Sequence, residues 1–195
     1  GLDGSVVTIG NFDGIHQGHQ KLLLALKKQA QKFESPQVVM TFHPHPLKIV
    51  FPEKKIFRLF SLQDQKEQLD KMGIDFLLRI PFDLALAETP AEKFFLEFIH
   101  QPLRPKALVI GHDFHFGKDR KGDVRALNEW KSRYHFEVEQ VQAYQIQNKV
   151  VSSSRVRELL AASDLLGVKE MLGRNYYIAG FVQPGVGRGK KLGFP

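Results

Sequence analysis

A glycine-rich segment with two histidines carries the residues best suited to chemistry in this sequence. It reads Gly10-Asn11-Phe12-Asp13-Gly14-Ile15-His16-Gln17-Gly18-His19, between an apolar run at 6–9 and an amphipathic helical pattern. A strand that ends in glycines and opens into a helix leaves backbone N–H groups free, and the helix dipole adds positive charge there. The segment therefore predicts a phosphate-binding turn with two imidazoles, His16 and His19.

Four more histidines follow two other apolar runs. His43 and His45 come directly after the run at 38–42, and His112 and His115 follow the run at 107–110. If the three runs are parallel strands, their carboxyl ends share one edge of the sheet, where ligands bind in such folds. A single histidine is more often an ordinary surface or core residue, but pairs at three strand ends favour a shared site.

Imidazole clusters serve two chemistries, metal ligation and the stabilisation of phosphoryl oxygens. His16 and His19 lie on a turn that favours anions, and a proline keeps His43 and His45 apart. The segment Ser152-Ser153-Ser154-Arg155 opens another helical pattern. Its hydroxyls and guanidinium can hold phosphate oxygens, although serines at such a position also act as plain helix caps. We therefore favour phosphate chemistry, and the sequence assigns no metal ligands.

Apolar runs and amphipathic patterns predict the elements that position these residues. Helices are expected at 17–34, 61–72, 90–99, 124–132, 152–162 and 164–173, and strands at 6–9, 38–42, 75–80, 107–110 and 136–141. Strands that alternate with helices in this way predict an α/β fold with a doubly wound parallel sheet. Beyond Gly173 the pattern changes, because 176–182 is β-like and glycines punctuate a basic stretch. We expect a domain boundary there.

Composition narrows the class of protein. The chain has 195 residues, of which 43% are hydrophobic and 25% charged, which suits one substantial domain and part of a second. No apolar run approaches the roughly 18–20 residues that span a bilayer, no signal peptide is recognised, and cysteine is absent. We therefore expect a cytoplasmic protein. The net charge of +7 suits a polyanionic partner, either a nucleic acid or a nucleotide.

Five segments, in order along the chain, resemble one enzyme family. The segment 10–19 resembles the His-x-Gly-His signature of the nucleotidyltransferase superfamily, in the form found in bacterial FAD synthetases, which are bifunctional riboflavin kinase/FMN adenylyltransferases. The segments 41–46, 111–117, 152–157 and 187–195 are similar to further motifs of that family. The departures are small: His43 stands where an acidic residue is common, His115 where arginine is expected, and Ser154 where threonine is usual.

The resemblance implies two domains and one reaction. A Rossmann-like FMN adenylyltransferase domain is expected over 1–173, and the start of a riboflavin kinase β-barrel over 174–195. The implied reaction is ATP + FMN giving FAD and pyrophosphate, with Mg²⁺ accompanying ATP. Because the kinase-like segment stops at Pro195, we expect riboflavin phosphorylation from a longer parent protein and not from this chain.

The resemblance also implies a site for each substrate. The expected catalytic residues are His16, His19 and Arg155. The expected nucleotide-binding residues are Gly10, Phe12, Asp13, His16, Gly18, His19, Ser153, Ser154 and Arg155. The expected flavin-binding residues are Pro44, His45, Pro46, Asp113 and Phe116.

ATP and FMN are thus the expected partners, with no nucleic acid and no membrane, in a monomer or weak homo-oligomer. Another His-x-Gly-His nucleotidyltransferase, with phosphopantetheine or nicotinate mononucleotide as acceptor, is an alternative that the flavin-like loop at 113–117 and the kinase-like tail disfavour. A basic nucleic-acid-binding module is a further alternative. It leaves the histidine pairs unexplained, and no basic stripe with interleaved aromatic residues supports it.

Overall fold

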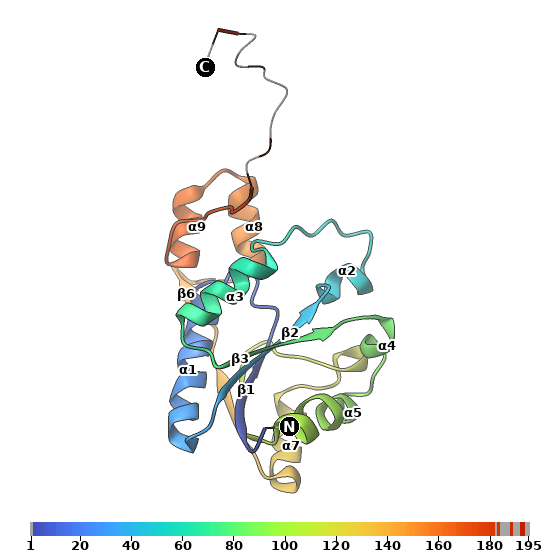
Figure 1. Cartoon of the computed structure of the whole chain (residues 1–195). Helices are drawn as coiled ribbons and strands as arrows, with labels where there is room; N and C mark the ends of the chain where they lie inside the picture. The colour runs from blue at the N-terminus through green and yellow to red at the C-terminus, as the bar shows by residue number, and fades with distance from the viewer. Residues whose placement is uncertain (1, 182, 184–187, 189–191, 194–195) are drawn as a thin grey trace.

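Five parallel strands form the central sheet, in the order β3-β2-β1-β4-β5 (Figure 1). The strands are β1 (Ser5–Ile9), β2 (Gln37–His43), β3 (Phe76–Pro81), β4 (Pro105–Gly111) and β5 (Glu137–Val141). The computed structural model describes residues 2–181, 183, 188 and 192–193. The parallel α/β fold expected from the sequence is confirmed.

Both faces of the sheet are covered, which explains why its central strands are apolar throughout. In β1, Val7 and Ile9 enter one core cluster, and Val6 enters the cluster on the opposite face. Leu108 and Val109 of β4 divide between the two faces in the same way. Side chains alternate along a strand, so a continuous apolar run supplies both cores at once.

The helices form two layers around the sheet. On one face lie α1 (Gln17–Phe33) and α3 (Leu62–Lys71), and on the other α5 (Ala91–Phe94), a π-helical turn η1 (Phe95–His100), α6 (Gln101–Leu103) and α7 (Val124–Tyr134). Short helices α2 (Pro46–Val50) and α4 (Leu84–Ala87) follow β2 and β3, and η2 (Lys118–Arg120) is a 3₁₀ turn after β4. A two-stranded hairpin, β6 (Gln145–Ile146) and β7 (Lys149–Val150), leads from β5 into α8 (Ser153–Ala161) and α9 (Leu165–Leu172).

The last two helices pack at the carboxyl end of the sheet, close to α3 and the start of α1 (Figure 1). Val156, Leu159, Val168 and Leu172 bury their apolar faces against one another and against Leu59. This third cluster places the N-terminus of α8 beside the carboxyl end of β1. The strand order also reverses at β1, between β2 and β4, which is where ligands bind in doubly wound sheets.

Some expected elements differ in the structure. The helix expected at 90–99 extends to Leu103 and contains the π-helical turn, which apolar spacing alone does not predict. The expectation of β-like structure at 176–182 is wrong for 176–181, which form no strand, and Val182 lies outside the described residues. Most of the kinase-like motif at 187–195, in the barrel fragment expected at 174–195, also lies outside them.

Candidate active site

The histidine pair lies where β1 ends and α1 begins. His16 is the N-cap of α1, and its Nδ1 accepts a hydrogen bond of 3.3 Å from the backbone N–H of His19. The two imidazole rings stack with centroids 3.6 Å apart and planes 17° apart. A ring nitrogen that accepts a hydrogen bond carries no proton, so neutral His16 holds its proton on Nε2 and can donate it.

Both imidazoles are kept neutral. Burial lowers the pKa of His16 from 6.5 to about 4; the charge of Asp113 opposes this shift and that of Arg174 adds to it. Burial also lowers the pKa of His19, and His16 contributes in the same direction. Neutral N–H donors at a helix N-terminus suit phosphoryl oxygens, because the helix dipole supplies positive charge without a titrating group.

Several buried polar atoms around the turn have no protein partner. Within the described residues they include Thr8 Oγ1, Asn11 Oδ1 and His19 Nδ1, and also Gln65 Oε1, Arg155 Nε and Arg174 Nε. Buried polar atoms are nearly always hydrogen-bonded, because leaving one unpaired costs about 1–3 kcal/mol. Such atoms between the end of β1 and the first turn of α1 indicate groups that a ligand satisfies.

A second helix N-terminus meets the first. Ser152 caps α8 by accepting a hydrogen bond from Arg155 N–H, and the Ser153 hydroxyl donates to the carbonyl of Asp13 at 2.9 Å. A Cβ added to Gly18 would lie 3.2 Å from the His16 ring and 3.4 Å from the Val151 carbonyl. Gly18 therefore lets α1 and the start of α8 approach closely, and the positive ends of the two dipoles converge.

Arg155 and Ser154 lie at the start of α8. Arg155 forms an ion pair of 2.9 Å with Glu158, three residues along the same helix, while its own side chain is 35% exposed. Such partly exposed pairs contribute little, so the guanidinium can turn to another anion at small cost. Ser154 is exposed.

Asp13 is engaged by the protein itself. Its carboxylate is buried and accepts hydrogen bonds from the N–H groups of Leu59 and Phe60 and from the Arg157 guanidinium. Asp13 thus ties the glycine turn to the segment before α3 and to α8. The sequence placed it among the nucleotide-binding residues; its protein contacts are those of a positioning residue.

Phe12 and Gly10 form the inner wall of the turn. Phe12 is fully buried in the core beneath α1, and the centre of its ring lies 5.1 Å from that of His19. A Cβ on Gly10 would lie 3.2 Å from the Phe12 ring. The backbone of Phe12 has φ +47°, and Gln65, fully buried in α3, donates to the Asn11 carbonyl at 2.8 Å.

The expected flavin-binding residues divide into two groups. His45 is buried and caps α2, accepting a hydrogen bond from Leu47 N–H at 3.2 Å, and Pro44 and Pro46 flank it. Burial lowers the pKa of His45; Asp13 opposes the shift, and Arg157 adds to it. The charges of the Asp13–Arg157 pair therefore act on His45.

The loop after β4 supplies the second group. Asp113 is exposed, and its charge acts on His16, so the structure brings these loops together. Phe116 is buried in the core, with its ring 5.3 Å from that of Phe114 and 5.7 Å from that of Phe94. Phe116 therefore supports the loop from within.

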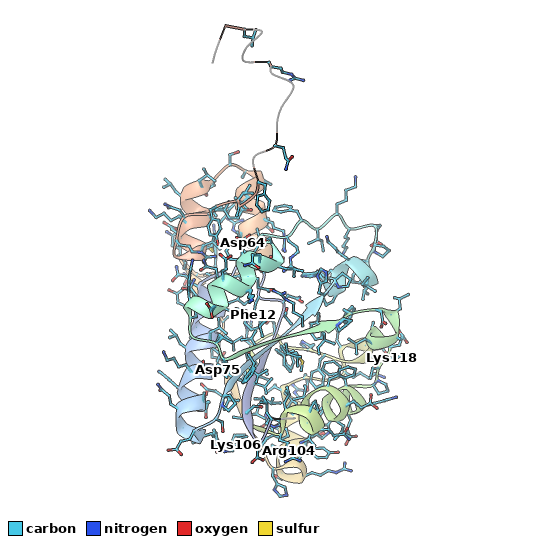
Figure 2. The ribbon with its side chains drawn as sticks, in the orientation of Figure 1. Phe12, Asp64, Asp75, Arg104, Lys106 and Lys118 are labelled. Carbon is cyan, nitrogen blue, oxygen red and sulfur yellow. The ribbon has the colours of Figure 1, made fainter. Side chains whose placement is uncertain are left out.

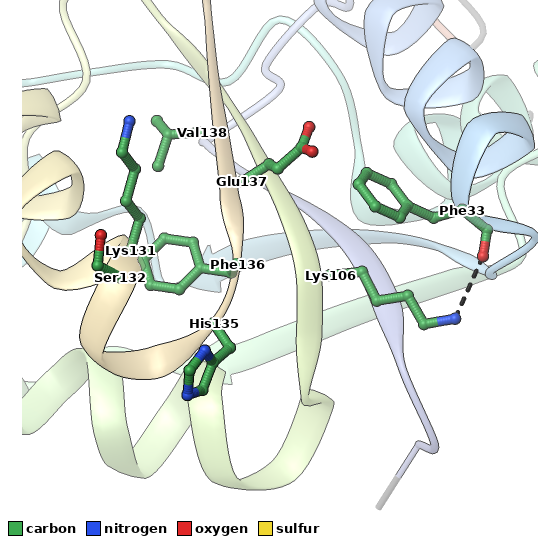
Figure 3. A pocket seen from close by; sticks show the side chains of 8 residues that line it. All are labelled: Phe33, Lys106, Lys131, Ser132, His135, Phe136, Glu137 and Val138. Atoms are coloured by element: carbon green, nitrogen blue, oxygen red, sulfur yellow. Dashed lines mark hydrogen bonds between the residues drawn. The ribbon is translucent and has the colours of Figure 1, made fainter.

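A cavity elsewhere in the molecule does not belong to this site. It measures about 600 Å³ and lies at the opposite edge of the sheet, between the ends of α1 and α7 (Figure 3). Its polar side chains point in different directions, and Lys106 Nζ is bonded to the Phe33 carbonyl. Figure 2 shows Phe12 under α3, well separated from Lys106 and Arg104 at that far edge.

Sequence reasoning missed several residues around the turn. Gln20, Gln65, Arg157 and Arg174 all bond to its backbone or to Asp13. Arg157 stands inside the recognised 152–157 segment and could have been singled out there. Gln65 and Arg174 carry no local signal, because their partners are distant in sequence, and Gln20 lies in the helical pattern that follows the turn with nothing to mark its bond to Ile15.

One protein family matches most of the chain. The sequence model of the FAD synthetase family matches residues 2–155. A relative from Escherichia coli (strain K12), described as a bifunctional riboflavin kinase/FMN adenylyltransferase, is 36% identical over 193 residues, covering 99% of this chain and 62% of its own length. A relative of the same description from Haemophilus influenzae is 35% identical and covers 100% of this chain and 63% of its own length. Another, from Pseudomonas fluorescens, is 37% identical and covers 98% of this chain and 61% of its own length. The chain thus spans about three fifths of these relatives.

A solved structure is also similar. The crystal structure described as a macrolide-efflux protein from Streptococcus pneumoniae has a TM-score of 0.88 and 30% identity, covering 100% of this chain and 64% of that one. None of the helices described for the present chain has the length and apolar character needed to cross a membrane.

Proposed function

The chain belongs to the FAD synthetase family, and we propose that it transfers the adenylyl group of ATP to FMN, giving FAD and pyrophosphate. The observation that carries this proposal is the stacked, neutral His16–His19 pair at the N-terminus of α1, beside the N-terminus of α8. Two converging helix N-termini suit a triphosphate. The efflux description of the structural relative gives no reason for such a constellation.

The transfer needs no nucleophile from the protein. A phosphate oxygen of FMN attacks the α-phosphorus of ATP in line, forming the new P–O bond while the bond to the β-phosphate oxygen breaks and pyrophosphate leaves with that electron pair. Catalysis of such a step consists mainly of positioning and charge stabilisation. His16 Nε2–H and the imidazole of His19 donate to the phosphoryl oxygens that gain charge.

The remaining residues at the α8 terminus would hold the leaving pyrophosphate. Arg155 exchanges its contact with Glu158 for the β- and γ-phosphate oxygens, and the exposed Ser154 hydroxyl donates to them. Ser153 and Asp13 act differently from the other nucleotide-binding residues. Their hydrogen bonds to each other's segments fix the turn on which the triphosphate rests.

The flavin would lie on the other side of the histidines. His45, with Pro44 and Pro46 around it, and Asp113 border that side, and Phe116 supports the loop from the core. The printed names of the longer relatives also include riboflavin kinase, and we place the start of such a domain at 174–195. The absence of cysteine fits the reducing cytoplasm in which we place the reaction.

Mg²⁺ would enter with ATP. Among the described residues, no group of three or more histidine, aspartate or glutamate side chains could hold a metal ion. The ion would be held mainly by triphosphate oxygens and water, as Mg²⁺ bound with a nucleotide usually is.

The test is direct. The purified chain is incubated with Mg-ATP and FMN, and FAD and pyrophosphate are quantified after separation; riboflavin, nicotinate mononucleotide and phosphopantetheine replace FMN in parallel. We expect FMN alone among these acceptors to take up the adenylyl group, with release of pyrophosphate and formation of FAD. Adenylyl transfer to another acceptor, with none to FMN, would overturn the proposal and favour a different nucleotidyltransferase.

A further inference from the structure

Two side chains donate hydrogen bonds to backbone carbonyls of the glycine turn. Arg174, directly after α9, donates to the carbonyls of Gly14 at 2.6 Å, Ile15 at 3.0 Å and Leu172 at 3.1 Å. Gln20 of α1 donates to the carbonyls of Ile15 at 3.0 Å and Leu172 at 2.8 Å. We name this arrangement the carbonyl bracket: Arg174 and Gln20 as donors, and the Gly14, Ile15 and Leu172 carbonyls as acceptors.

The bracket fixes the direction of two backbone amides. In a trans peptide unit the C=O and N–H groups point in opposite directions. When the carbonyls of Gly14 and Ile15 face Arg174, the N–H groups of Ile15 and His16 face the other way. Within the described residues, these two N–H groups have no hydrogen-bond partner. They are therefore available to an anion.

The conformation that the bracket holds is a strained one. Ile15 has φ +39° and follows Gly14 at φ +79°. Positive φ is ordinary for glycine, but for a β-branched residue it is an outlier that costs of order 1–3 kcal/mol. Such a conformation persists only where the surroundings impose it, and the bracket supplies three hydrogen bonds to the Gly14 and Ile15 carbonyls. Two more, to the Leu172 carbonyl, tie the same donors to the end of α9.

We propose that Arg174 is a positioning residue for phosphate binding and adenylyl transfer, which aims the Ile15 and His16 amides at phosphoryl oxygens by holding the carbonyls behind them. The inference rests on the proposed function for its reaction, but it concerns the anion-binding turn itself. Arg174 is half-buried and reaches all three carbonyls, whereas Gln20 reaches only two. Its planar fork of donors suits that task, and lysine cannot reproduce it.

Arg174 is also held from its other side. Its guanidinium lies 4.9 Å from the centre of the Phe60 ring, and the N–H of Phe60 bonds to Asp13. The residue that follows α9 is therefore connected both to the turn and to the segment that Asp13 anchors. A side chain placed merely to end α9 would need none of these contacts.

The experiment compares Arg174→Lys and Arg174→Gln with Val168→Ala. Val168 is fully buried in α9, so its truncation loosens the packing of α9 without removing a bracket contact. Three quantities are measured: kcat for FAD formation, KM for FMN, and the Kd of inorganic pyrophosphate by calorimetry, all well below each variant's melting temperature. Pyrophosphate binding tests the turn even if the acceptor is not FMN.

We expect both Arg174 variants to lose kcat roughly 10- to 100-fold, since small misplacements of binding groups have effects of that size. We also expect pyrophosphate to bind at least about tenfold more weakly, with KM for FMN unchanged, while Val168→Ala lowers only the melting temperature. Removing the charge of Arg174 lets the pKa of His16 rise, so the acid limb of kcat moves to higher pH in Arg174→Gln but not in Arg174→Lys. Asp113 and His19 are the other titratable groups that act on or contact His16.

Two outcomes overturn the proposal. One is wild-type pyrophosphate affinity in Arg174→Lys, and the other is an equal loss of kcat in Val168→Ala. If Arg174→Gln does not fold, Arg174→Lys alone decides. Failure of the wild-type chain to form FAD would contradict the proposed function only. The Kd of pyrophosphate in the wild type and the Arg174 variants would still test whether the carbonyl bracket positions the turn.

Discussion

The rings of His16 and His19 stack at 3.6 Å, and the Nδ1 of His16 accepts the backbone N–H of His19. One imidazole thus caps the helix and positions the other. The cap needs an unprotonated Nδ1, so the structure of the turn and the neutral state of His16 depend on each other.

Stability should fall as the medium becomes acidic. The pKa of His16 is about 4 in the folded chain against 6.5 in the unfolded one, so the unfolded state takes up a proton first. The contribution of His16 to the free energy of unfolding is fully present above pH 6.5. It is lost as the pH falls from 6.5 to 4, a decrease of about 3 kcal/mol. Urea unfolding at several pH values measures the slope.

His16→Asn supplies the control for that slope. Asparagine is a good N-cap but does not titrate, so the helix start is kept. We expect a shallower decline between pH 6.5 and 4, with the remainder coming from His19 and His45, whose pKa values are lowered too. An unchanged slope would contradict the assignment to His16.

The Asp13–Arg157 pair should be a structural requirement. Asp13 is 2% and Arg157 17% exposed, and removal of one partner leaves the other buried and uncompensated. We expect Asp13→Ala to lower the free energy of unfolding by about 3–5 kcal/mol. Asp3→Ala, which removes the exposed ion pair with Arg104, should change it little. Equal losses in the two variants would contradict a structural role for the Asp13–Arg157 pair.

Arg155 should contribute to the binding of ATP and little to the stability of the fold. Loss of a charge-assisted hydrogen bond costs about 1.5–3 kcal/mol, so Arg155→Gln should raise KM for ATP roughly tenfold or more. Its melting temperature should stay close to that of the wild type. Glu158→Gln removes only the present partner of Arg155, and we expect it to leave KM for ATP unchanged or slightly lower. A normal KM in Arg155→Gln would remove Arg155 from the site.

Gly18 should be needed for the geometry of His16. A methyl group at this position would lie 3.2 Å from the His16 Nδ1 and 3.4 Å from the Val151 carbonyl, so one of them must move. We expect Gly18→Ala to lower kcat roughly tenfold. The melting temperature should change little, because alanine also favours the helix by about 1 kcal/mol. Gly180→Ala, with nothing within 4 Å, is the matched control.

The order of elements could be predicted because each has a local signal. The helix expected at 17–34 is found at Gln17–Phe33, where Leu22, Leu23 and Leu26 face the core. The parallel arrangement follows from the alternation of strands and helices, and it brings the loops after β1, β2 and β4 to one edge. Convergence of the histidine loops was therefore predictable in outline.

What could not be predicted depends on contacts between distant residues. Asp13 bonds to Arg157, 144 positions away, and Arg174 to the carbonyl of Gly14, 160 positions away. No periodicity or spacing encodes such pairs. Phe12 and Phe116 stand in motifs, yet both are core residues, because a motif does not distinguish a side chain that contacts a ligand from one that supports the loop.

If the histidine pair stabilises the phosphoryl group in transfer, His19→Ala should impair adenylyl transfer while the chain still folds. FAD formation from ATP and FMN is measured beside the melting temperature, with His135→Asn at the far edge of the sheet as control. We expect a loss of turnover of about 10²–10³-fold in His19→Ala, with the fold intact, because one preorganised donor to the transferring phosphoryl group is gone. Turnover close to that of the wild type in a folded His19→Ala protein would contradict this role of the histidine pair.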